Sequence, residues 1–519
     1  MLHYSNSSAG VTKLDSLKIL GDHCIGTTES EKQFLKEVFV DSGKCKDILR
    51  KAINNPVVLI GKKGSGKSAM FFNLPIIANN IGLDSLLIKP DDIILKNIRG
   101  DSVSIGDVKR ESYNALLFSI AAKIGSRFDG MLSATQKTLR DTAVKAGQKD
   151  KDSIEKLAKF LSVLGKPLSQ LDLHQLLPEN KDVHHKEVER KVASHLKSND
   201  KAFLLLIDDT DQIVPGYIAS EISKIWGFLS AVRKISEEIP NIKCVVSLRT
   251  EVWRALCQSK GQRDQVDHFR PLKFDLDVPD EEIKEILSRR FEFVANKLDL
   301  HAKHPINCFF KGETTKLPTS NEHRLWLDYL VKSARSRPRD AIQLCKTFTD
   351  LAVEQGRSII DESMTDKVAL IYSEEKIEDV EAEFQNECTN VKPILRTFSE
   401  VGFDISADEI RAHLLKVPSK CSVIIRGETV ANDKPDSVFI LWKFLHEIGF
   451  LNARVPDSRE SRDFRHINYD DDQNFVSKGN WTDMQKCTWE VHPAYRSHLL
   501  KLKTDERSRV LGKQIRKGK

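Results

Sequence analysis

The sequence lacks the marks of a secreted, membrane-spanning or zinc-stapled protein. Nine cysteines are scattered through 519 residues without any Cys-x-x-Cys pair, which favours reduced thiols over disulfides or cysteine-bound metal. No apolar run approaches the roughly eighteen residues that cross a membrane, and the first twenty residues lack the apolar core of a signal peptide. We therefore expect a cytoplasmic protein with no membrane partner.

Strong net charge is also missing. The chain carries +6 with 40% hydrophobic and 30% charged residues, which is ordinary for folded soluble proteins and does not by itself argue for nucleic acid. The length suits two to four domains. Only the last stretch, 501–519, is locally basic, and it is either a solvated helix end or a contact for phosphates or an acidic partner.

A glycine-rich loop follows a short apolar run near the start of the chain. Val57–Ile60 predicts a buried strand, "SAMFFNL" predicts a helix, and the residues between them match G-x-x-x-x-G-K-[ST]. In this motif backbone N–H groups and the helix N-terminus surround phosphate oxygens. We expect Lys67 to reach the β- and γ-phosphates of ATP and Ser68 to hold Mg²⁺, and Pro75 to end or kink the helix early. The predicted nucleotide-binding residues are Gly61, Lys62, Lys63, Gly64, Ser65, Gly66, Lys67, Ser68 and Ala69.

A second apolar run ends in two acidic residues. Phe203–Ile207 predicts a buried strand that delivers Asp208 and Asp209 at its carboxyl end, the Walker B pattern. Asp208 is expected to complete the Mg²⁺ shell, and Asp209 to polarise the attacking water as a general base. Alone, such a run is more often a strand meeting a turn, but together with the glycine-rich loop it predicts a nucleotide site.

Two further segments carry arginines. "KCVVSLRTEVW" predicts a strand ending at Arg249, which resembles the sensor-one strand of STAND and AAA+-related ATPases and would then contact the γ-phosphate. "SARSRPRDAIQLCKTF" predicts a helix starting at Pro338, which resembles the sensor-two element of AAA+ and origin-recognition ATPases with Arg339 as its best match. The alternatives are a strand-end arginine paired with a surface carboxylate and a solvent-exposed arginine.

The order of these motifs resembles a prokaryotic family of P-loop ATPases related to AAA+ and STAND proteins, some of whose members lie among antiviral defence genes. The resemblance rests also on "FLKEVFVDSGKCKDILRKAINNPVVLIGKKGSGKSAMFF", "SLRTEVWRAL" and "EVHPAYRSHL". It implies an α/β fold: a parallel sheet with the Walker B strand beside the Walker A strand, helices on both faces, a helical lid and a C-terminal winged helix. The expected domains are an arm at 1–29, an ATPase core at 30–285, a lid at 286–385, a winged helix at 386–500 and a basic tail at 501–519.

Residues 106–200, between the two Walker motifs, are rich in helix formers and predict a helical insertion on one side of the sheet. Within it, His184, His185 and Glu187 do not make a metal site, because adjacent helical residues point about 100° apart and no ligand follows at i+4. Arg263, in the loop after the Arg249 strand, would reach a neighbouring subunit's nucleotide only in an oligomer.

The C-terminal third predicts three helices and two strands. A helix ending near Gly402 precedes a second that starts with a capping box, Ser406 and Glu409; the third ends at Gly449, and "FRHINYD" and "TWEVH" follow as strands. The third helix offers few polar residues to bases, so we favour a packing role for the predicted winged helix. Arg454, Arg459, Arg462 and Arg465 keep open a wing that contacts a nucleic-acid backbone.

The sequence thus predicts an Mg²⁺-dependent ATPase that acts as a molecular switch on a protein effector or on copies of itself, with a role in antiviral defence resting on the resemblance alone. One alternative is a DNA-binding initiator or remodeller that uses the winged helix and the basic tail. The other is a small-molecule kinase, although such kinases are usually shorter and lack the sensor arginines.

Overall fold

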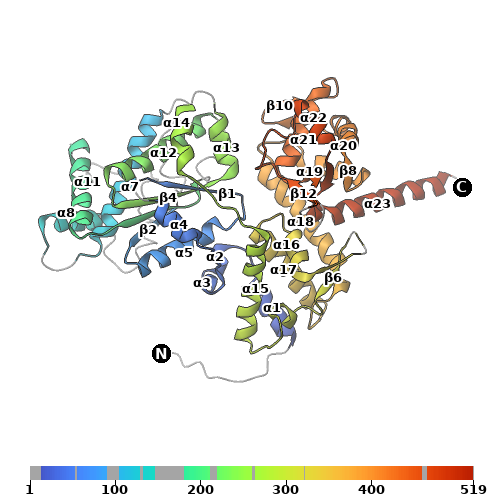
Figure 1. Ribbon diagram of the computed structural model, residues 1–519, viewed down its shortest axis with the longest axis horizontal. Coiled ribbons are helices and arrows are strands. Elements are labelled where there is room, and N and C mark those ends of the chain that lie inside the picture. Colours follow the sequence, from blue (N-terminus) through green and yellow to red (C-terminus); the bar gives the residue numbers. More distant parts are fainter. Residues whose placement is uncertain are drawn as a thin grey trace. The chain divides into compact units, whose positions relative to one another are not determined.

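The computed structural model describes residues 13–52, 55–89, 104–128, 132–145, 181–210, 219–259, 263–318, 320, 322–458 and 464–517. The chain divides into two compact units, which we call the strand unit (Lys32–Val278) and the helical unit (Met1–Glu31 with Pro279–Lys519) (Figure 1). Within the described ranges, we find no helix with the length and apolar character that crossing a membrane requires.

The strand unit is built on five parallel strands. Three of them consist largely of buried aliphatic residues, because a parallel sheet is covered on both faces. This confirms the predicted α/β fold with a parallel sheet. The strands are β1 (Val57–Gly61), β2 (Asp84–Ile88), β3 (Phe203–Ile207), β4 (Ile242–Arg249) and β5 (Lys273–Asp275).

The strand order is β2-β3-β4-β1-β5, which corrects the prediction that the Walker B strand lies beside the Walker A strand. β4, the strand that ends at Arg249, pairs with β1 on one side and with β3 on the other. The residues on β4 therefore stand between the glycine-rich loop and the two aspartates. Sequence order along the chain does not decide strand order, because a crossover helix can return the chain to any free sheet edge.

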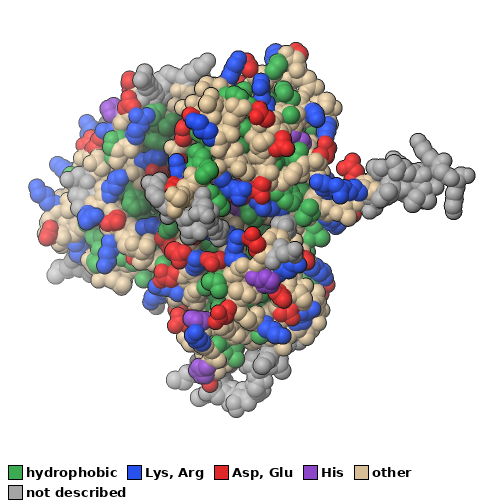
Figure 2. All heavy atoms as spheres, turned by 45° about the vertical axis from the view of Figure 1, so that its right-hand side comes forward, with side chains coloured by type: hydrophobic (Ala, Val, Ile, Leu, Met, Phe, Trp, Pro, Cys, Tyr) green, Lys and Arg blue, Asp and Glu red, His purple; other side chains and the backbone are tan. Residues whose placement is uncertain are grey.

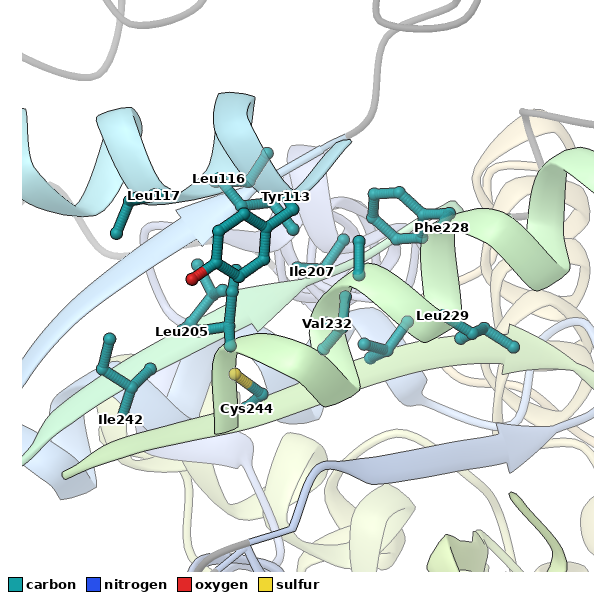
Figure 3. Packing of buried hydrophobic residues seen from close by; sticks show 14 of the residues in the cluster. Tyr113, Leu116, Leu117, Leu205, Ile207, Phe228, Leu229, Val232, Ile242 and Cys244 are labelled. Carbon is teal, nitrogen blue, oxygen red and sulfur yellow. The ribbon is translucent and has the colours of Figure 1, made fainter. Parts of the chain in front are cut away.

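Alternate residues of each strand serve the two faces of the sheet. On one face Leu205 and Ile207 of β3 and Cys244 of β4 pack under α7 (Ile105–Gly125) and α12 (Ala219–Glu238), which contribute Leu116, Leu117, Phe228, Leu229 and Val232 among others (Figure 3). The intervening residues, such as Leu204 and Leu206, are equally buried on the opposite face, where α5 (Lys67–Asn80) contacts β2 and β3. Helices therefore cover both faces.

The predicted insertion is helical where it is described. α8 (Ala134–Lys145) and α11 (Lys181–Ser198) pack with α7 on the same face of the sheet as α12 (Figure 1), whereas the stretch "DSIEKLAKFLSVLGK" lies outside the described residues. Of the two effects expected from Pro75, an early end of the helix is wrong, because α5 continues through Pro75 to Asn80, whereas a kink stays a prediction. The other helices of this unit are α3 (Leu35–Val38), α4 (Lys44–Lys51), α13 (Thr250–Gln258) and α14 (Arg263–Phe269).

The helical unit begins with helices that pack on one another across long sequence distances. α1 (Lys13–Asp22) packs against α17 (Pro338–Glu354) and α15 (Asp280–Lys297), so the N-terminal segment belongs with a region more than 250 residues later in the chain. The buried Arg290–Glu31 ion pair, 2.5 Å long, reinforces this contact. The remaining elements here are α2 (Thr28–Glu31), α16 (Trp326–Lys332), α18 (Thr365–Phe384), and the hairpin of β6 (Thr314–Lys316) and β7 (His323–Leu325).

The C-terminal part of the helical unit contains the predicted helices and strands. The capping box of Ser406 and Glu409 is confirmed at the start of α20, and Gly449, with φ 71°, follows α21. A strand that the prediction missed, β11, follows α21 directly and forms an antiparallel sheet of order β12-β11-β13-β8. The elements are α19 (Val391–Arg396), β8 (Asp404–Ser406), α20 (Ala407–Leu414), β9 (Val423–Ile425), β10 (Glu428–Val430), α21 (Val438–Glu447), β11 (Leu451–Pro456), β12 (Phe464–Ile467), α22 (Trp481–Gln485), β13 (Thr488–Val491) and α23 (Pro493–Lys517).

Candidate functional site

The glycine-rich loop joins β1 to α5, as predicted. Gly64 and Gly66 have φ of 81° and 94°, which only glycine adopts without strain, and a side chain on Gly61 would lie 2.6 Å from Ser65 Oγ. A Cβ on Gly66 would meet no atom within 4 Å. The loop therefore turns tightly at the carboxyl end of β1, and the space beside Gly66 is open to a ligand.

Polar groups gather inside this loop. The Lys67 ammonium donates to the carbonyl oxygens of Gly61 at 2.6 Å and Lys62 at 3.0 Å. Ser65 is 7% exposed, and its buried hydroxyl has no hydrogen-bond partner among the described residues. A buried hydroxyl without a partner is costly unless a ligand satisfies it. Together with the N-terminus of α5, these groups are suited to an anion.

Ser68 and Asp208 belong to motifs 140 residues apart in the sequence, and Ser68 influences the pKa of Asp208. Asp208 follows β3 and is 2% exposed. Burial and the adjacent charge of Asp209 raise the pKa of Asp208, whereas hydrogen bonds from Ser247, the Asp209 backbone and Ser68 act in the opposite direction. That these two side chains share one ion stays a prediction.

Asp209 has an unusual backbone and a cationic neighbour. Its φ of 56° is left-handed, a conformation that is uncommon outside glycine and that often occurs at functional sites. Its Oδ2 atom lies 3.1 Å from Nζ of Lys89, the residue after β2. The pairing joins the carboxyl ends of two neighbouring parallel strands and orients the Asp209 carboxylate. Lys89 was not singled out in the sequence, although its position directly after an apolar run is a usable signal.

Arg249 lies at the carboxyl end of β4 and precedes α13. It is paired in register with Gly61, the first residue of the glycine-rich loop. The strand order therefore brings Arg249 to the same edge of the sheet as the loop, the edge where the carboxyl ends of parallel strands bind ligands in open α/β folds. Its role as a sensor of the γ-phosphate stays a prediction.

Ser247, also missed in the sequence, connects the two acidic residues to β4. Its hydroxyl donates to Asp208 Oδ1 at 2.6 Å and accepts from the backbone N–H of Asp209 at 3.0 Å. A serine inside the apolar run "CVVSL" is the signal that could have identified it, because an isolated polar residue in a buried strand needs a specific partner.

The arginines of "RSRPRD", residues 335–340, lie in the helical unit and have different environments. The side chain of Arg337 is 8% exposed and pairs with Glu383 at 3.0 Å, so this carboxylate offsets the unfavourable position of a cation at the start of α17. Arg335 pairs with Asp340 at 2.6 Å inside the same unit. Arg339 is less buried, and its Nε donates to the carbonyl oxygen of Gly26 at 3.0 Å. Its sensor role stays a prediction.

The remaining predicted site residues are less informative. The side chains of His184, Arg263, Arg459 and Arg462 lie outside the described residues, whereas His185 packs edge-on against Phe118. Among the side chains that are described, no cluster of three or more His, Cys, Asp or Glu is arranged to hold a metal ion. A magnesium site at Ser68 and Asp208 would thus use two protein ligands, in keeping with the preference of Mg²⁺ for water and substrate phosphates as its other ligands.

Comparisons with known proteins give distant similarities. Residues 281–381 match a family model described as the FunZ-associated C-terminal helical domain. A putative transposon gamma-delta 80.3 kDa protein of Escherichia coli (strain K12) is 21% identical over 486 residues, which cover 90% of this chain. The chain spans 65% of the length of that relative.

Solved structures that align with most of the chain do so at low scores. They include a Walker-type ATPase, paby2304, of Pyrococcus abyssi (11% identity, TM-score 0.40, covering 89% of this chain and 96% of that one). The ORC2 protein of Aeropyrum pernix aligns at 12% identity and a TM-score of 0.39, with 91% and 94% coverage. Cdc6p from Pyrobaculum aerophilum aligns at 13% identity and 0.34, with 92% and 94% coverage.

Proposed function

We propose that this chain binds ATP with Mg²⁺ at the edge of the strand unit, hydrolyses it, and acts as a nucleotide-controlled switch. The observation that carries the proposal is the glycine-rich loop between β1 and α5, where the buried Ser65 hydroxyl has no hydrogen-bond partner among the described residues, together with the buried Asp208 carboxylate at the end of β3. A strand-end carboxylate buried next to a phosphate-binding loop has little structural purpose, because its burial raises its pKa and disfavours the charged form. A bound divalent cation would favour the charged carboxylate.

Each residue of the proposed site has a chemical task. The backbone of Gly61–Ser68 and the Lys67 ammonium would bind the phosphates, and Ser65 would gain the partner that its hydroxyl lacks among the described residues. Ser68 and Asp208 would hold Mg²⁺, which offsets negative charge on the phosphate oxygens when bound. Asp209 would orient the attacking water and accept its proton. Arg249 would contact the terminal phosphate, and Arg339 is proposed as a second sensor.

The switch function requires a responding partner. We propose that the nucleotide state alters a surface used by a protein effector or by a second copy of the chain, because a ligand shifts a conformational equilibrium only when it binds one state better. A place for such a system in antiviral defence rests on the family resemblance of the sequence motifs.

Three observations weigh against DNA reading as the main function. Seven of the ten residues of α21 are buried, and its Lys443 donates a hydrogen bond to Asn474. Arg454 on β11 is engaged by Asp404 at 2.5 Å and by Glu490 at 3.3 Å. Lys and Arg side chains are also mixed with Asp and Glu over the face shown in Figure 2. We therefore treat DNA binding as an alternative, which the experiment examines by adding duplex DNA to the purified chain.

The proposal is tested by phosphate release and nucleotide binding of the purified chain, with particle size followed by light scattering, in the presence and absence of duplex DNA. We expect Lys67→Ala to lose both binding and turnover. Asp209→Asn should retain binding and lose turnover by about 100-fold or more, since general-base catalysis contributes on that scale. Lys197→Ala and Asp141→Asn, two exposed helical positions of the strand unit, serve as matched controls.

Four results would contradict the proposal. Wild-type protein without ATP binding would reject the site itself. Turnover that survives Lys67→Ala and Asp209→Asn would assign the activity to a different site or a contaminant. Consumption of ATP without phosphate release, accompanied by a phosphorylated small molecule, would favour the kinase alternative, and salt-sensitive DNA binding without turnover would favour the DNA-binding one.

A further inference from the structure

Ser247 occupies a position where a polar side chain is expected to be costly. It is 0% exposed in β4, and Cys244, Val245, Val246 and Leu248 around it are also fully buried. A hydroxyl moved from water into such surroundings costs free energy unless it forms hydrogen bonds. Its presence in the middle of an apolar strand therefore calls for a specific role.

The hydroxyl and the carbonyl oxygen of Ser247 form hydrogen bonds with the three residues that follow β3. The hydroxyl donates to Asp208 Oδ1 at 2.6 Å and accepts from the Asp209 N–H at 3.0 Å. The Ser247 carbonyl accepts a hydrogen bond from the hydroxyl of Thr210, which is itself 0% exposed. One residue of β4 thus binds three consecutive residues of the neighbouring segment.

These contacts begin where regular strand pairing ends. The β3–β4 register runs from Phe203 opposite Ile242 to Ile207 opposite Val246, and it stops there. Asp208 donates its backbone N–H to Ile88 of β2, on the other side. Beyond that point Asp209 turns into a left-handed conformation, so sheet hydrogen bonds do not hold it. The Ser247 side chain holds Asp208 and Asp209 beside β4, as the hydrogen bonds between β3 and β4 hold the preceding residues.

We propose that Ser247 is a positioning residue of the nucleotide site, which orients the Asp208 carboxylate toward Ser68 and holds the backbone of Asp209 in its left-handed turn. This inference rests on the proposed function and extends it to a residue that does not itself touch nucleotide. Its position on β4 also matters, because the same strand pairs with β1 at Leu59 and ends at Arg249. Through the pairing of β4 with β1, Ser247 therefore connects the two acidic residues to β1, the strand that precedes the phosphate-binding loop.

The proposal predicts that Ser247→Ala changes nucleotide binding without metal and nucleotide binding with Mg²⁺ to different extents. Alanine fits the buried space but removes both the donor to Asp208 and the acceptor for the Asp209 N–H. Binding of nucleotide without metal uses the glycine-rich loop and should stay within about twofold of wild type. The gain in affinity on adding Mg²⁺ should fall by about 10-fold or more, the scale of a hydrogen bond to a charged group. The kcat should fall with it, while KM for ATP changes less.

The experiment compares Ser247→Ala with Ser112→Ala and Ser247→Thr. Ser112 is 1% exposed in α7 of the same unit, and its hydroxyl has no hydrogen-bond partner among the described residues, which makes it a matched control for losing a buried hydroxyl. Ser247→Thr keeps the hydroxyl and should restore the Mg²⁺ effect. Calorimetric titration with ATP, with and without Mg²⁺, gives the binding readout, and phosphate release gives kcat and KM.

Hydrogen exchange of the ligand-free protein supplies a readout that does not depend on nucleotide. Peptides covering Phe203–Thr210 should exchange faster in Ser247→Ala than in wild type, because the Asp209 N–H loses its acceptor. In Ser112→Ala, the same peptides should exchange at the wild-type rate. Faster exchange with an unchanged Mg²⁺ effect would overturn the positioning role and leave Ser247 as a packing residue. Unchanged exchange would overturn it directly. Wild-type protein that binds no ATP would reject the proposed function and this extension, even if exchange responded as expected.

Discussion

The strand unit and the helical unit handle buried charge in opposite ways. In the strand unit the sheet core is apolar, and acidic side chains come together at one edge, where Asp208 is buried beside another carboxylate and its pKa is raised. In the helical unit, buried charges pair with opposite charges: Arg290 with Glu31, Arg335 with Asp340 and Arg337 with Glu383. A buried charge without an opposite charge beside it is typical of a ligand site, whereas a buried ion pair is typical of a structural contact between elements.

The "RSRPRD" segment, residues 335–340, shows what this difference teaches. Two of its three arginines, Arg335 and Arg337, are held in buried ion pairs, and Arg335 also donates to the hydroxyl of Tyr495 at 3.0 Å. Tyr495 belongs to "EVHPAYRSHL", another stretch that carries the family resemblance. A motif that looks like a ligand sensor in the sequence therefore also joins α17 to α23. Only Arg339 keeps a largely backbone-directed contact, which leaves it the best sensor candidate of the three.

Breaking the buried network should have the largest effect on stability. Asp340 is bound by Arg335 and lies 3.4 Å from Lys376; although burial alone would raise its pKa, these two cations lower it. Asp340→Asn leaves both cations without this carboxylate and should lower the free energy of unfolding by about 3–5 kcal/mol. Chemical unfolding, with hydrogen exchange of α17 and α18, measures the loss.

Asp350→Asn provides the control for this variant. It removes an exposed i,i+4 pair with Lys346 on the same helix, and such pairs contribute about 0.5 kcal/mol or less. Equal destabilisation by the two variants would show that buried ion pairing does not hold the helical unit together.

Acid should weaken the helical unit through Glu490. Burial acts to raise the pKa of Glu490, but the hydrogen bond and charge of His466, together with Arg496 and Arg454, lower it from 4.5 to about 2. Because the folded-state pKa is depressed, the stabilisation is complete above pH 4.5 and is lost as pH falls toward 2. Glu490→Gln should therefore destabilise by up to about 3 kcal/mol near pH 6, with a difference from wild type that shrinks below pH 4.5.

Urea unfolding of wild type and Glu490→Gln between pH 6 and 3.5 tests this expectation. Glu428→Gln, at an exposed position of β10, should match wild type throughout. A difference between wild type and Glu490→Gln that stays constant down to pH 3.5 would contradict the assigned pKa direction.

The apolar packing of the strand unit should respond to volume instead of charge. Gly227 lies in α12 where it crosses α7, and an added Cβ would lie 2.5 Å from Val108 Cβ and 2.9 Å from the Ile105 carbonyl oxygen. Glycine to alanine normally stabilises a helix interior, but here overpacking should lower the free energy of unfolding by about 1–3 kcal/mol. Thermal or chemical unfolding measures the change.

Two companion variants separate overpacking from other causes. Gly106→Ala, with no atom closer than Ser104 Oγ at 3.7 Å, should be nearly neutral. Val108→Ala should recover part of the stability that Gly227→Ala loses, since it removes part of the clash. Stabilisation by Gly227→Ala would show that α7 and α12 separate easily.

Several features of the site were predictable because their causes are local. The strand, the glycine-rich loop and the helix of residues 57–80 follow from side-chain burial and from the φ values that Gly64 and Gly66 require. The capping box of Ser406 and Glu409 spans four residues, and its hydrogen bonds form within them. Pro75 misled the prediction because neighbouring contacts of α5 outweigh a single missing backbone hydrogen bond.

Other features depend on which distant segments become neighbours. The insertion of β4 between β1 and β3 could not be read from strand patterns, since all three strands have the same apolar character. Lys89 and Ser247 gained their importance only from that order, which brings them to Asp209 and Asp208. The left-handed backbone of Asp209 was hidden for the same reason, because aspartate adopts that conformation only where its surroundings stabilise it.

The sequence by itself determined the phosphate-binding loop, the apolar strands and the residues that end or cap several helices, because these depend on side chains within a few positions of one another. The tertiary structure decided which strand lies between the loop and the aspartates, and which arginines of "RSRPRD" form buried ion pairs. Arg335 and Tyr495 are 160 residues apart along the chain. Contacts over such distances follow from how whole elements pack, and no local pattern specifies them.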